Sequence, residues 1–176
     1  MTEDIFKHII DKYKYIELIK MNPSDLVFEE RVKMNCFYCG KYGNNWKCPP
    51  NIPEIEYKNM VFEYNQGYFV VLKMPLTKEN YDEVRTNSSI VLHRACLDIE
   101  KFLWKHNDST SISFIGGSCK LCKTGCGLTK CNSPYMSRTP LEAIGVSVNK
   151  SIEKYGIELI YPPVEYMYRI GLVLFD

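Results

Sequence analysis

Seven of the eight cysteines in this 176-residue chain fall into two short segments, and this clustering constrains the fold most strongly. The first segment, CFYCGKYGNNWKCPP at residues 36–50, holds three cysteines separated by two and by eight residues. The second, GGSCKLCKTGCGLTKC at residues 116–131, holds four, separated by two, three and four residues. In a reducing compartment, thiols gathered in this way indicate metal binding or catalysis rather than disulfides.

Length and composition predict one globular domain over residues 1–176, with an apolar fraction of 45%. The net charge of +1 gives no general attraction to nucleic acid or to a membrane surface. Acids and lysines interrupt the apolar residues of the first twenty positions, which is unlike a signal peptide. No apolar run approaches the roughly twenty residues of a membrane span. We therefore expect a cytoplasmic protein.

Hydrophobic patterning predicts helices and strands that build one sheet with helical cover. We expect helices over residues 4–20, 53–64, 89–106 and 139–155, and strands over residues 25–34, 68–74, 112–115, 157–161 and 168–175. Thr139 as N-cap, Pro140 at the first position and Glu142 in a capping box predict the start of the last helix. The predicted fold is α/β or α+β, a single domain with a mixed sheet covered by helices and two cysteine-rich loops at strand ends.

The spacing in the second segment is typical of iron–sulfur ligands, because closely spaced thiolates can wrap one cluster. The candidate ligands are Cys119, Cys122, Cys126 and Cys131. A zinc ribbon prefers two cysteine pairs with a longer span between them, so that each pair forms its own knuckle. The spacing therefore favours a [4Fe-4S] cluster, with zinc as the alternative.

The first segment supplies only three candidate ligands, Cys36, Cys39 and Cys48. Three thiolates suit a cluster with one iron left open, and they equally suit a zinc site that a remote residue completes. Ligands can also be exchanged between two clusters, so Cys131 is a candidate for the first cluster as well. The sequence leaves the division of the seven cysteines open.

Neither cysteine segment contains an acidic residue, although both contain lysines. The cations are Lys41 and Lys47 in the first segment, and Lys120, Lys123, Lys130 and Arg138 in or just after the second. Cations there would offset the negative charge of a thiolate-bound cluster and raise its potential. Ordinary solvated lysines and docking of an acidic electron-transfer partner are the other two interpretations.

Cys96 differs from the other seven cysteines because it falls within a predicted helix, on one apolar stripe with Leu92, Ile99 and Leu103. We expect it to be buried as a small hydrophobic side chain rather than to bind metal. The three histidines have no ligand-like spacing, and we expect each of them to be structural: His8, His93 and His106.

Three motifs in this order resemble a known prokaryotic family of unknown function, whose members are described as predicted metal-binding proteins. The motifs are CxxC-x2-YG-x4-CPP from Cys36, GGSCxxCxxxC-x4-C-x2-P from Gly116, and RxxLEAxGV from Arg138. In the family form proline directly follows the arginine, whereas Thr139 intervenes here. The resemblance spans most of the chain and implies seven ligand positions and iron–sulfur content. It implies no reaction.

The leading hypothesis is a cytoplasmic iron–sulfur protein with one or two [4Fe-4S] clusters, acting in electron transfer. The first alternative is an enzyme that binds a small, for example sulfur-containing, substrate at an open iron. The second alternative is a structural zinc-binding module. We expect a redox partner protein or a small-molecule substrate. We expect no nucleic-acid partner, because no Rossmann, Walker or basic helical motif is present. The sequence leaves enzyme status and oligomeric state open.

Overall fold

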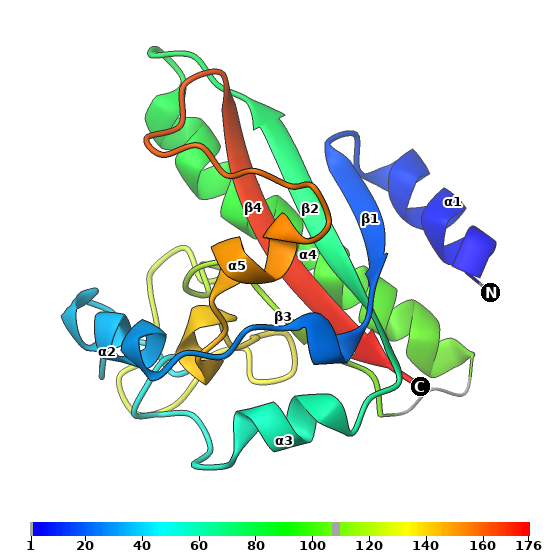
Figure 1. Cartoon of the computed structure of the whole chain (residues 1–176). Coiled ribbons are helices and arrows are strands. Elements are labelled where there is room, and N and C mark those ends of the chain that lie inside the picture. The colour runs from blue at the N-terminus through cyan, green and yellow to red at the C-terminus, as the bar shows by residue number, and fades with distance from the viewer. Residues whose placement is uncertain (1, 107–109) are drawn as a thin grey trace.

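The computed structural model describes residues 2–106 and 110–176, which form one four-stranded sheet with helices around it (Figure 1). The described elements, in chain order, are α1 (Thr2–Lys12), β1 (Ile16–Met21), η1 (Pro23–Asp25), α2 (Glu30–Tyr38), α3 (Tyr57–Phe62), β2 (Gln66–Pro75), α4 (Tyr81–Lys105), β3 (Ile112–Phe114), η2 (Glu142–Ile144), α5 (Val148–Glu153) and β4 (Tyr166–Phe175). Among the described helices, none has the length and apolar character that a membrane crossing requires.

The strand order in the sheet is β1-β2-β4-β3. All three described pairings are antiparallel, so the sheet is not mixed, while the predicted class of one sheet covered by helices is confirmed. The reason lies in β4, which is last in the chain and inserts between β2 and β3. Both neighbours run opposite to β4, and they therefore run parallel to each other without being paired.

The central strand β2 is buried on both faces, as its continuous apolar run predicts. Tyr68, Val70 and Leu72 face one core, whereas Phe69 and Val71 face the other. This alternation follows from the two-residue period of a strand. The sheet is consequently the middle layer between two hydrophobic clusters.

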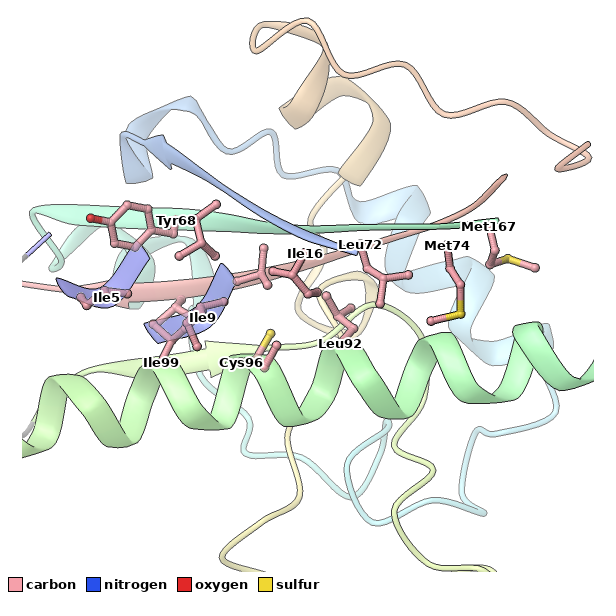
Figure 2. Packing of buried hydrophobic residues seen from close by; sticks show 14 of the residues in the cluster. Ile5, Ile9, Ile16, Tyr68, Leu72, Met74, Leu92, Cys96, Ile99 and Met167 are labelled. Carbon is pink, nitrogen blue, oxygen red and sulfur yellow. The ribbon is translucent and has the colours of Figure 1, made fainter. Parts of the chain in front are cut away.

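Helix α4 lies along one face of the sheet and packs on β2 and β4 (Figure 1). Its apolar stripe of Leu92, Cys96 and Ile99 points toward the sheet, while Ile5 and Ile9 of α1 pack into the same cluster (Figure 2). Cys96 is 0% exposed, which confirms the prediction that it is a buried hydrophobic side chain. The helix begins at Tyr81, eight residues before the predicted start.

The prediction of one helix over residues 4–20 is wrong, because α1 ends at Lys12 and β1 begins at Ile16. Ile16 and Leu18 are buried on either side of the exposed Glu17, which is the period of a strand and not of a helix. The longer helix is predicted because apolar side chains recur every three or four residues, at Ile5, Ile9, Tyr13 and Ile16.

The predicted strand over residues 25–34 is also wrong, since Glu30–Tyr38 form the helix α2. This helix buries none of its residues, so the sequence contains no buried helical period from which it could be predicted. Cys36 lies within α2 and Cys39 caps its end. The first cysteine segment therefore begins in the last turn of a helix, and only the second follows a strand.

The predicted helix over residues 139–155 is divided into η2 and α5. Gly145 separates them with a φ of 91°, a left-handed conformation that a continuing α-helix cannot contain. Residues 157–161 form no strand, and the helix predicted over residues 53–64 shortens to α3. The strands predicted over residues 68–74, 112–115 and 168–175 are confirmed as β2, β3 and β4.

The close approach of α4 to β4 predicts the effect of a side chain at Gly171. A Cβ atom there would lie 2.5 Å from the Cys96 sulfur. We expect Gly171→Ala to lower the free energy of unfolding by about 1–3 kcal/mol in urea denaturation. In a Cys96→Ala background the loss should be smaller, because the clashing atom is gone. Equal losses in both backgrounds would contradict this packing.

Candidate metal centre

The second cysteine segment leaves β3 and crosses residues 116–139 without a helix or strand, although every residue in this stretch is described. Its four thiols line one cavity of about 620 Å³: those of Cys119, Cys122, Cys126 and Cys131. Aspartate, glutamate and histidine are all missing from the described lining of this cavity. Apart from amide and hydroxyl groups, the metal-ligating side chains in the described lining are therefore cysteines.

The first cysteine segment closes into a loop at the end of α2. Gly40 and Gly43 adopt φ angles of 68° and 69°, which turn the chain back on itself. The N–H of Gly43 then donates to the carbonyl oxygen of Pro49 at 2.9 Å. This closure leaves Cys48 only 6% exposed, whereas Cys39 at the end of the helix is exposed.

Two side-chain hydrogen bonds join the first segment to the second. The Asn45 amide Nδ2 donates to the carbonyl oxygen of Cys119 at 3.2 Å. The Trp46 indole Nε1 donates to the carbonyl oxygen of Gly127 at 2.7 Å. Both donors project from the loop between Cys39 and Cys48, so the two segments lie side by side although about seventy residues separate them in the chain.

Cys48 lies at the junction of the two segments. Burial raises the pKa of its thiol to about 12. Smaller contributions in the same direction come from thiols of both segments: Cys39, Cys36, Cys119 and Cys126. The Cys48 thiol is therefore close enough to thiols of both segments for their charges to act on it. The two cysteine motifs, which are far apart in the sequence, lie near each other in the structure.

The pKa values of Cys36 and Cys119 are also raised, first of all by burial. A buried thiol without a counter-charge favours its protonated form. Metal ligation requires the thiolate, so a cation that binds here must displace protons and supply the compensating positive charge.

Among the described residues, no group of three or more histidine, cysteine, aspartate or glutamate side chains is arranged to hold a metal ion. Ligands of a single zinc ion would converge to about 2.3 Å from it. The four cysteines of the second segment line a cavity of about 620 Å³. Soft thiolate ligands suit zinc, copper(I) and iron–sulfur clusters as chemical classes.

Five cationic side chains line the same cavity: Lys41, Lys47, Arg94, Lys120 and Lys123. Burial lowers the pKa of Lys120, and the neighbouring cations Arg169, Arg85 and Lys41 lower it further. Its ammonium group donates to the hydroxyl of Ser89 on α4 at 3.2 Å. The sequence predicted cations in the two loops, but it gave no sign that Arg94 would join them from α4.

A buried ion pair holds the end of the second segment. Arg138 donates to both carboxylate oxygens of Glu100 on α4, at 2.9 and 2.7 Å, and the two side chains are 14% and 3% exposed. The Ser113 hydroxyl of β3 also donates to Glu100. Next to Arg138, the Ser137 hydroxyl lies 3.4 Å from the Cys131 sulfur, from which it can accept a hydrogen bond. The ion pair thus fixes the backbone beside a candidate ligand.

Glu142 is the first residue of η2 and does not form the predicted capping box with Thr139. Its carboxylate accepts hydrogen bonds from its own backbone N–H and from that of Gly117, at the start of the second segment. Burial raises its pKa, and its charge acts on the Cys36 thiol of the first segment. Its Oε2 atom is shielded from solvent and has no hydrogen-bond partner in the part of the chain that the structure describes.

The three histidines lie outside the lining of the cavity that the four cysteines share. His93 is buried in α4, and its Nε2 lies at hydrogen-bond distance, 2.9 Å, from the carbonyl oxygen of Met136. Burial lowers the pKa of His93 to about 4. His8 and His106 are exposed. Within the described lining of the cavity there is no imidazole.

Residues 19–175 match a family described as "Predicted metal-binding protein (DUF2284)". The chain belongs to this family. The match includes all seven clustered cysteines and the Arg138 motif, and it confirms the family resemblance seen in the sequence. No curated protein and no solved structure matches the chain.

The buried ion pair predicts a large effect for one substitution in this DUF2284 protein. Arg138→Gln leaves the Glu100 carboxylate buried without its cation, which we expect to cost about 3–5 kcal/mol of unfolding free energy in urea. Lys154→Gln is the control, because it removes a cation from the ion pair with Asp25, in which the lysine side chain is 66% exposed. A loss in Arg138→Gln no larger than in the control would contradict the structural role of the pair.

Proposed function

We propose that this DUF2284 protein is a cytoplasmic iron–sulfur protein that binds [4Fe-4S] clusters and acts in electron transfer. The observation that carries this proposal is the cavity of about 620 Å³, which the four cysteines of the second segment line and whose described lining contains no carboxylate or imidazole. Cysteine thiolates are the usual ligands of such clusters. The ligands that we propose are Cys119, Cys122, Cys126 and Cys131.

The first segment supports a second cluster. Cys36, Cys39 and Cys48 lie within electrostatic reach of one another, and Cys48 also senses two thiols of the second segment. Cys48 is therefore the residue that links the two adjacent candidate sites. We propose two clusters, with these three thiols as ligands of the first.

The chain provides the surroundings that such a group needs. When bound, a [4Fe-4S] cluster supplies one-electron chemistry at a potential that charge, hydrogen bonds and solvent exposure determine. The half-buried Lys120 places positive charge on the cavity wall and would raise that potential. All eight cysteines are free thiols, which suits a reducing cytoplasm.

One observation favours an enzyme as the second candidate. The first segment offers three thiols, and Cys39 is exposed, so a fourth position at this site would be open to solvent and to a small sulfur-containing substrate. Titration with sulfide, followed by electron paramagnetic resonance of the reduced protein, separates the two candidates. A saturable change that is lost in Cys48→Ser supports the enzyme, and an unchanged spectrum supports the carrier.

The proposed ligands can be tested by replacing each clustered cysteine with serine. We expect every one of the seven variants to lose iron after anaerobic purification, because serine is a poor substitute for thiolate. Cys96→Ser is the matched control and should keep the wild-type iron content, since Cys96 packs in the core between α4 and β4. Iron and acid-labile sulfide are measured per chain.

Two outcomes would contradict the proposal. The first is a colourless wild-type protein with stoichiometric zinc and no iron, which would support the structural zinc module instead. The second is loss of iron in Cys96→Ser with retention in the clustered variants.

A further inference from the structure

The lining of the thiol-containing cavity concentrates positive charge, whereas the chain as a whole has a net charge of only +1. The sequence contains 22 lysines and arginines against 21 aspartates and glutamates. The described lining of the cavity contains five of these cations and no acidic side chain. We call these five residues the cationic rim: Lys41, Lys47, Arg94, Lys120 and Lys123. Average composition therefore does not explain this local charge.

None of the ion pairs among the described residues uses a member of the cationic rim. The ion pairs among the described residues use other cations, namely Lys12, Arg31, Lys33, Arg138, Lys150 and Lys154. The rim also comes from three separate parts of the chain: the first cysteine segment, α4 and the second cysteine segment. Folding thus brings together distant cations that repel one another, which lowers stability unless an anionic group outside the chain compensates.

The residues of the cationic rim differ in solvent exposure, and therefore in whether their charge acts on the cavity or on an approaching molecule. Lys120 is half-buried and bonded to Ser89, so its charge acts mainly on the inside of the cavity. Lys41, Arg94 and Lys123 are exposed. Water and salt screen an exposed charge from a buried group, but such a charge still contributes to the field that meets an approaching molecule. The exposed members are therefore placed to attract a partner.

We propose that the cationic rim is the docking surface for an acidic one-electron carrier protein, which exchanges electrons with the metal centre through the cavity opening. This inference rests on the proposed electron-transfer function. Complementary charge accelerates encounter between such partners and orients them. Docking at the rim brings the partner's redox centre to the side of the protein where Cys126 is exposed.

The geometry favours a protein over a nucleic acid. A nucleic-acid backbone is followed by an extended stripe or groove of basic residues, with aromatic side chains on which bases stack. The five cations instead line one cavity, and the aromatic residue in its described lining, Trp46, is half-buried with its indole N–H bonded to the carbonyl oxygen of Gly127. A compact acidic patch on a protein fits this arrangement.

The test measures binding of a plant-type ferredoxin, an acidic [2Fe–2S] carrier, to the anaerobically purified protein by isothermal titration calorimetry. We expect the Kd to rise by about tenfold or more between roughly 20 and 300 mM salt. The variant Lys41→Gln/Arg94→Gln/Lys123→Gln should weaken binding at low salt by about tenfold. The matched control Lys7→Gln/Lys14→Gln/Lys20→Gln removes the same charge from exposed positions on α1, β1 and the turn between them, and should change the Kd by less than about twofold.

Several results would overturn the inference. They are no detectable binding at low salt, a Kd that does not depend on salt, an equal effect of the rim and control variants, and tighter binding of a short DNA duplex than of ferredoxin. A rim variant that shifts the redox potential but leaves the ferredoxin Kd unchanged would show that the cations serve the metal centre alone. Because binding is measured without electron transfer, failure of docking is distinguishable from absence of iron, which metal analysis reports separately.

Discussion

The ion pair between Glu100 and Arg138 is the constraint on which the candidate site depends. The second cysteine segment has no helix or strand of its own, so no ladder of backbone hydrogen bonds holds its shape. Backbone hydrogen bonds of Ile115 with Thr139 and Leu141 close its two ends, and side chains from other parts of the fold hold the stretch between them. Arg138 ties its end to α4, while Asn45 and Trp46 of the first segment bond to its backbone. The rigid layer of α4 and the sheet thereby positions an irregular segment that carries four thiols.

Local patterns in the sequence were sufficient for three of the four strands and for the buried face of α4, but not for β1. The continuous apolar run of β2 and the bounded runs of β3 and β4 predict buried strands, and the stripe around Cys96 predicts the buried face of α4. These elements could be predicted because burial imposes a regular period on their side chains. Where burial is weak, prediction failed: α2 buries no residue, and Gly145 interrupts a pattern that otherwise continues as a helix.

The chemistry of the candidate site was visible in the sequence, but its assembly was not. The spacing of the cysteines and the lack of acids beside them predict a thiol site with positive surroundings. The contribution of Arg94, the anchoring by Glu100 and the bond from Asn45 to Cys119 all come from residues far away in the chain. Only the tertiary structure shows that the two cysteine motifs form one neighbourhood around Cys48.

The central claim is that the clustered thiols hold a polynuclear iron–sulfur group rather than a single ion. X-ray absorption at the iron and zinc edges of the anaerobically purified protein tests it most directly, because the scattering shells distinguish metal neighbours from sulfur neighbours. We predict iron with a sulfur shell and an additional iron–iron shell. Zinc with four sulfur neighbours at about 2.3 Å and no metal–metal shell would contradict the account.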